Sequence, residues 1–116
     1  MSVNWVLCEG SVWCNFFTVN LSNSHFHNLE GVYVIWCDDG PCLRVGQGDI
    51  RDRLGAHRIH PDFRAYKDHN VLVTWASVEA VHRDGVELYL AQELQPVMGQ
   101  RFPEVTPIPV NLPGQQ

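Results

Sequence analysis

The fold is decided by residues 31–57, which read GVYVIWCDDGPCLRVGQGDIRDRLGAH. The first part, residues 31–37, is a short run of residues that are common in β-strands. Asp39-Gly40-Pro41 then breaks this run with residues suited to a turn. Residues 43–46 can return as the paired strand. The stretch therefore predicts a β-hairpin.

A helix is expected directly after the hairpin. Gly46 and Gly48 relax the backbone there, and Asp49 can cap a helix by accepting its unpaired N–H groups. The next residues recur at i, i+3, i+4 and i+7, so they share one helix face: Ile50, Arg53, Leu54 and His57. Arg53 and His57 stand where a purely structural helix would carry aliphatic residues. The face is either an amphipathic edge at the solvent boundary or part of a site.

A second strand and a second helix follow. Residues 71–78, VLVTWASV, predict a buried strand that pairs with the hairpin in a small, mainly antiparallel sheet. The helix is expected from about Val86 to Leu94, with Asp84 as its N-cap and Pro96 as its stop. A short helical turn over residues 78–83 is a possible extension in front of it.

Glu87 stands out on this second helix. It shares a face with three apolar residues, namely Leu90, Ala91 and Leu94. Burying an unpaired carboxylate costs several kcal/mol, so Glu87 should pair with a cation or a metal, or lie at the helix end where water reaches it.

The two flanks differ from the core. Residues 15–21 alternate apolar and polar side chains and predict a strand that either extends the sheet edge or mediates self-association. A polar loop should follow, in which His25 and His27 either bind a metal or face solvent. Four prolines predict an extended tail. We therefore expect an N-terminal β extension over residues 1–30, a core over 31–99 and a Pro-rich tail over 100–116.

Composition is that of one globular domain. The chain has 116 residues, 45% of them hydrophobic and 18% charged, which allows a core without metal or disulfides. It contains no apolar run of about 18 residues and no basic-then-apolar start, so we expect a cytoplasmic protein without membrane contact. Four cysteines form no CxxC pair, which favours structural or incidental thiols over zinc. Cys37 and Cys42 flank the expected turn and should remain thiols.

Charge is distributed unevenly along the chain. The net charge of −5 argues against indiscriminate nucleic-acid binding. Residues 44–67 nevertheless carry six basic side chains against three acidic ones. This segment predicts a small basic patch that can meet a phosphate. Its candidate nucleic-acid contacts are Arg51, Arg58, Arg64 and Lys67.

Three short motifs, in this order, resemble the GIY-YIG nuclease family: Gly31-Val32-Tyr33, Arg44-Val45-Gly46 and Arg53-Leu54-x-x-His57. Residues 87–96, ELYLAQELQP, are similar to the second conserved helix of that family, where a metal-binding Glu lies nine residues before a Pro. The resemblance covers residues 31–99. Arg44 stands in place of the second Tyr, Gly99 in place of an Asn, and the spacing before Arg53 is one residue shorter than the family pattern.

The resemblance implies an α/β (α+β) domain in which helices flank a three-stranded antiparallel sheet, here with an extra N-terminal strand. It implies hydrolysis of DNA phosphodiester bonds with one divalent cation, Mg²⁺ or Mn²⁺. Glu87 would anchor the cation by oxygen ligation. Tyr33 would orient or deprotonate the attacking water, His57 would hydrogen-bond Tyr33 or that water, and Arg53 would stabilise charge on the phosphate. Arg44 would lower the pKa of Tyr33 and bind phosphate, or would mark a site that no longer cleaves.

Two alternatives stay open. The first is a non-catalytic binding or scaffold protein of the same fold, in which Tyr33 packs in the sheet and Arg44, Arg53 and Glu87 form a salt-bridge network. The second is a zinc or redox protein built on the cysteines. Neither the structure of the DNA substrate nor a possible homodimer follows from these patterns.

Overall fold

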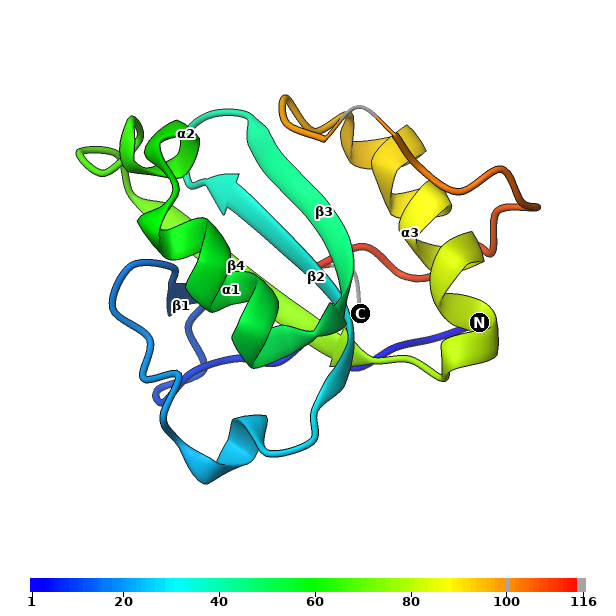
Figure 1. The fold of residues 1–116 in the computed structure, drawn as a ribbon, viewed down its shortest axis with the longest axis horizontal. Coiled ribbons are helices and arrows are strands. Elements are labelled where there is room, and N and C mark those ends of the chain that lie inside the picture. Colours follow the sequence, from blue (N-terminus) through cyan, green and yellow to red (C-terminus); the bar gives the residue numbers. More distant parts are fainter. Residues whose placement is uncertain (100, 115–116) are drawn as a thin grey trace.

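The computed structural model describes residues 1–99 and 101–114 and has a four-stranded antiparallel sheet in the order β1-β4-β2-β3 (Figure 1). The strands are β1 (Cys14–Asn15), β2 (Glu30–Cys37), β3 (Cys42–Asp49) and β4 (Val71–Ser77). The helices are the 3₁₀ turn η1 (Ser24–Phe26), α1 (Ile50–Ile59), α2 (Pro61–Arg64) and α3 (Ala80–Leu94). The predicted α+β class, the hairpin and its pairing with the strand after residue 70 are confirmed.

Strand β2 lies in the middle of the sheet and pairs with β3 on one side and β4 on the other. Its side chains alternate between two cores, because successive residues of a strand point to opposite faces. Tyr33 and Ile35 join the core under α1, whereas Val32 and Val34 join the core under α3. In Figure 1, α1 and α3 accordingly lie on either side of the β2–β3 hairpin.

Helix α1 begins where the sequence predicts. The Asp49 side chain caps it by accepting a hydrogen bond from the backbone N–H of Asp52 at 3.0 Å. Ile50 and Leu54 are fully buried against the sheet. The polar, Pro-containing residues 59–70 predict a helix exit followed by a loop, but the short helix α2 begins there with Pro61.

The predicted start of the second helix is wrong. Helix α3 begins at Ala80, so Asp84 lies inside it and is not its N-cap. Gly85 does not interrupt the helix, because its missing side chain makes room for the C-terminal tail: a Cβ there would lie 2.6 Å from Ile108 Cγ1. The helix ends at Leu94, ahead of Pro96 as predicted, with Gln95 in the left-handed conformation at φ 47°.

The predicted strand over residues 15–21 is also wrong beyond its first residue. The Asn15 side chain accepts hydrogen bonds from the backbone N–H groups of Phe17 (2.9 Å) and Thr18 (3.2 Å), which turns the chain away from the sheet. The short strand β1 extends the sheet edge next to β4, which was one of the two roles expected for this region. Within the described residues, no helix is long and apolar enough to cross a membrane.

A disulfide joins Cys8 and Cys14, whereas Cys37 and Cys42 are free thiols as predicted. The bond occupies both N-terminal sulfurs and removes the four-cysteine zinc site that we considered. Stable disulfides are rare in the reducing cytosol, so this bond counts against the cytoplasmic location expected from the sequence.

The C-terminal segment, described over residues 101–114, has no helix or strand, in agreement with the predicted extended tail. Asn111 ties it to the N-terminal segment. Its side chain accepts a hydrogen bond from the Val3 backbone N–H at 2.8 Å and donates one to the Val3 carbonyl at 3.0 Å. Val110 is buried in the core under α3. Residues 100, 115 and 116 of the predicted tail lie outside the described part of the chain.

Candidate active site

Two glycines of β3 make room for the candidate catalytic side chains. Tyr33 pairs with Gly46, and its ring lies over this residue so closely that a Cβ on Gly46 would overlap the ring and its hydroxyl. Gly48 has a positive φ of 125°, and a Cβ there would lie 3.0 Å from Arg53 Nε. On the face of β3 that lies toward α1, the two glycines therefore leave room for the side chains of Tyr33 and Arg53.

Gly46→Ala should lower the free energy of unfolding by about 1–3 kcal/mol, because the added methyl displaces a fully buried tyrosine. Gly55→Ala is the matched control. In helix α1 its Cβ would meet only Leu21 Cδ1, at 3.9 Å, so we expect a gain of about 0.5–1 kcal/mol. Urea titrations of both variants measure the difference. Equal stability of Gly46→Ala and the parent would contradict this placement of Tyr33.

Tyr33 and His57 form a hydrogen-bonded pair with a distance of 2.7 Å between the phenol oxygen and Nε2. Burial, assisted by Arg44 and Arg53, lowers the pKa of His57 to about 4. The imidazole is therefore neutral near pH 7 and can accept the phenol hydrogen. Burial raises the pKa of Tyr33, and the Arg44 guanidinium opposes that rise. Phe63 stacks on the His57 ring at 4.7 Å between centroids and helps to orient it.

Arg44 and Arg53 flank this pair without forming the salt-bridge network of the scaffold alternative. The two salt bridges among the described residues are His60–Asp62 and Arg83–Glu30. Arg53 is exposed, and Arg44 is half-buried. Both guanidinium groups therefore have capacity for an external anion.

Glu87 approaches β3 from the opposite side, on helix α3. Gln47 Nε2 donates to Glu87 Oε1 at 3.2 Å and to Asp84 Oδ1 at 2.6 Å. Burial raises the pKa of Glu87, while the Gln47 hydrogen bond lowers it and Asp84 raises it further. Asp84 and Gln47 were missed as site residues. Two sequence signals could have identified them. Asp84 lies three residues before Glu87 and so shares its helix face, and the alternation of side chains along the strand turns Gln47 toward α3.

These three side chains suit a hard divalent cation. Mg²⁺ and Mn²⁺ take oxygen ligands, which the two carboxylates provide, and rotation of the Gln47 amide would present its oxygen in place of its NH₂ group. Across residues 1–99 and 101–114, three or more His, Cys, Asp or Glu side chains nowhere gather to hold a metal. A cation at Glu87 would therefore depend on substrate phosphate and water for its remaining ligands, as is usual for Mg²⁺.

The candidate nucleic-acid contacts divide into two groups. Arg58 donates to the carbonyl of Phe16 through Nε and Nη2, at 3.1 and 2.9 Å, and to that of Val19 at 2.8 Å. Arg51 donates to the Asn23 carbonyl at 3.1 Å. These two arginines hold the N-terminal segment on the core. Arg64 and Lys67 are exposed, so they remain available for the predicted role.

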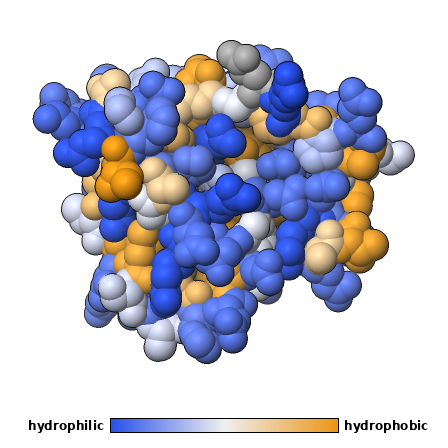
Figure 2. All heavy atoms as spheres, in the orientation of Figure 1, coloured by the Kyte–Doolittle hydropathy of each residue, from blue (hydrophilic) through white to orange (hydrophobic). Residues whose placement is uncertain are grey.

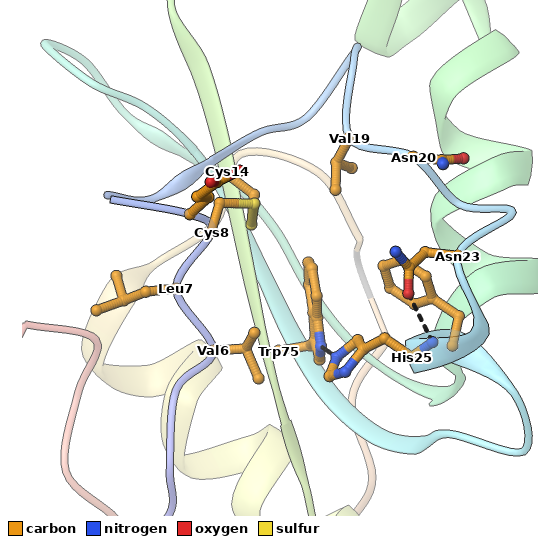
Figure 3. Close-up of a pocket in the computed structure, with 11 residues that line it drawn as sticks. Val6, Leu7, Cys8, Cys14, Val19, Asn20, Asn23, His25 and Trp75 are labelled. Carbon is orange, nitrogen blue, oxygen red and sulfur yellow. Dashed lines mark hydrogen bonds between the residues drawn. A yellow bond between two sulfur atoms is a disulfide. The ribbon is translucent and has the colours of Figure 1, made fainter. Parts of the chain in front are cut away.

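A cavity of about 480 Å³ lies between the N-terminal segment and β4, and none of the residues assigned roles by the nuclease resemblance lines it (Figure 3). The Cys8–Cys14 disulfide forms part of its wall. His25 Nε2 accepts a hydrogen bond from Trp75 Nε1 at 3.0 Å, while His27 Nε2 lies 3.3 Å from Asn28 Nδ2. The two histidines thus have different partners, which does not favour the metal pair that we considered.

Comparisons of the chain with protein-family models, with curated proteins and with solved structures gave no match. In the orientation of Figure 1, hydrophilic side chains cover much of the middle of the molecule between α1 and α3 (Figure 2).

Proposed function

We propose that the chain is a divalent-metal-dependent endonuclease that hydrolyses DNA phosphodiester bonds, as a divergent member of the GIY-YIG nuclease family. The observation that carries this proposal is the Tyr33–His57 hydrogen bond of 2.7 Å, beside two arginines that form no salt bridge with a carboxylate in the described chain. Such a pair can move a proton, and such arginines can bind a phosphate.

The proton path follows from the hydrogen bond. As a water molecule attacks phosphorus, one of its protons passes to the Tyr33 oxygen, and the phenol proton passes to His57 Nε2. Because the pKa of His57 is lowered to about 4, its ring begins the reaction neutral and able to accept that proton. The departing oxygen takes a proton from solvent, and His57 releases its proton to solvent, which completes the hydrolysis.

Arg53 supports the charge that develops on the phosphate. Its exposed guanidinium projects past Gly48 and has N–H donors for two phosphate oxygens. Arg44 lies on the other side of Tyr33 along β3 and favours transient negative charge on the phenol oxygen.

Glu87 would hold the cation, with Asp84 and Gln47 as the nearby oxygen donors. When bound, a divalent cation polarises the scissile phosphate and stabilises the departing oxygen. Gln47 keeps the two carboxylates together, since its amide bonds to both. The raised pKa of Glu87 reflects burial, and a cation offsets that cost by pairing with the carboxylate.

Cleavage of supercoiled plasmid and of a set of branched oligonucleotides tests the proposal. We expect nicking in Mg²⁺ or Mn²⁺ and none with excess chelator, because the phosphate charge is then not stabilised. Products separated on denaturing gels measure the rate. Absence of cleavage on every substrate and with both metals would contradict the nuclease function.

The alternative is a binding or scaffold protein that has the fold without the activity. The observation that favours it is Arg44 at the position of the second Tyr, together with a net charge of −5. A Mn²⁺ titration followed by melting temperature separates the two, since a cation site stabilises the folded state by mass action.

A further inference from the structure

A second hollow lies beside the Tyr33–His57 pair, between α1, α2 and the segment that follows α3. Its volume is about 300 Å³, and we call it the Arg44 pocket. Val97 and Met98 close one side, because their backbone N–H groups bond to the carbonyls of Cys42 and Leu43 at 3.0 and 2.9 Å. Its polar lining comes from Arg44, His57, His60 and Asp62.

Arg44 is half-buried, and its charged or polar neighbours include the Tyr33 phenol beside it and the Glu87 carboxylate, which attracts it from beyond salt-bridge distance. Its Nε atom is buried and makes no hydrogen bond. No carboxylate in the described chain forms a salt bridge with it. A half-buried guanidinium that forms no salt bridge with any described carboxylate is incompletely compensated, so this pocket can accept an anion.

The backbone and the neighbouring rings support an anion here. Gly99, at a positive φ of 85°, lies against the guanidinium: a Cβ on this residue would be 3.3 Å from Arg44 Nη1. His60 Nδ1 accepts the Asp62 backbone N–H at 3.1 Å, which leaves Nε2 as the N–H donor of the neutral ring. His57 uses Nε2 for Tyr33, so its proton lies on Nδ1.

The charge of the lining sets the class of anion. The Asp62 carboxylate lies 3.8 Å from His60 Nδ1 and opposes the single fixed positive charge of Arg44. The pocket therefore suits a singly charged phosphodiester better than a phosphomonoester dianion. A phosphodiester held here would be adjacent to Tyr33, because Arg44 lies beside the phenol.

We propose that the Arg44 pocket binds the phosphodiester next to the one that is cut. The proposal rests on the proposed nuclease function, which puts the cut phosphate at Tyr33. The subsite itself is a binding site, so it can be tested without cleavage. It implies that the substrate strand continues for at least one nucleotide beyond the cut on the side of α2.

The test compares Arg44→Gln with Arg101→Gln, an exposed site that loses the same charge. Single-stranded oligonucleotide binding is measured by fluorescence anisotropy with chelator present, from low to moderate salt. We expect Arg44→Gln to reduce the slope of log affinity against log salt by about 0.7, the contribution of one phosphate contact, and Arg101→Gln to leave it unchanged.

Dimethyl phosphate, a singly charged phosphodiester, is the second probe, and it also controls for folding. At about three times its Kd it should raise the melting temperature of the parent and of Arg101→Gln by about 3 °C, and it should not affect Arg44→Gln. An equal slope change in both variants overturns the proposal, since that is a net-charge effect. A dimethyl phosphate effect without any change in slope also overturns it, because the pocket then takes only a free anion. If the parent binds as expected in both experiments but cleaves no substrate, the nuclease function is refuted and the subsite remains.

Discussion

Glu87→Ala is expected to lower metal-dependent cleavage about 10³-fold or more. The carboxylate is the candidate anchor of the cation, and a metal ion at a phosphoryl site contributes several kcal/mol to stabilisation of the transition state. The measurement is the initial nicking rate in Mg²⁺ and in Mn²⁺. The same variant should also lose any rise in melting temperature that Mn²⁺ causes in the parent.

Glu93→Ala is the matched control for this experiment. Glu93 lies on the same helix and is exposed, so its loss removes the same charge without touching the Gln47–Asp84–Glu87 group. We expect it to cleave like the parent. Parent-like cleavage by Glu87→Ala would instead show that the cation is held elsewhere or is not needed.

Tyr33→Phe is expected to reduce the cleavage rate by about 10²–10⁴-fold while keeping the fold. The ring is fully buried and remains in place, whereas the hydroxyl that passes the proton to His57 is lost. The melting curve should change little, since one such hydrogen bond contributes about 1 kcal/mol. Tyr89→Phe on α3 is the control, because Tyr89 packs against the core under α3 and not against the Tyr33–His57 pair.

The pH profile distinguishes a proton relay from simple packing. His57 has a pKa lowered to about 4, so the acceptor form predominates above that pH and is lost below it. In the parent, kcat at saturating cation, which keeps Glu87 ionised, should therefore rise with pH through about 4, and His57→Gln should lose this limb together with most of the rate. A Tyr33→Phe variant as active as the parent would remove Tyr33 from the mechanism.

The sequence by itself determined the local elements. Turn residues at 39–41 predict the hairpin, and Asp49 predicts the start of α1, because both depend on contacts between near neighbours. The prediction of a strand over residues 15–21 failed because the Asn15 side chain accepts hydrogen bonds from the backbone two and three residues later, which bends the chain. The predicted start of α3 was wrong because Asp84 lies inside the helix, where its side chain accepts a hydrogen bond from Gln47 of β3, 37 residues earlier in the chain, and does not cap the helix.

Only the tertiary structure decided how the candidate site is composed. Tyr33 and His57 are 24 residues apart, and Gln47 and Glu87 are 40 apart, yet each pair meets at the same edge strand. Motif spacing identified Tyr33, His57 and Glu87 but not Gln47 or Asp84, whose contacts exist only when α3 packs beside β3. The absence of a salt bridge at Arg44 likewise depends on where the fold places every described carboxylate. A missing partner can be recognised only after the chain has placed every other charge.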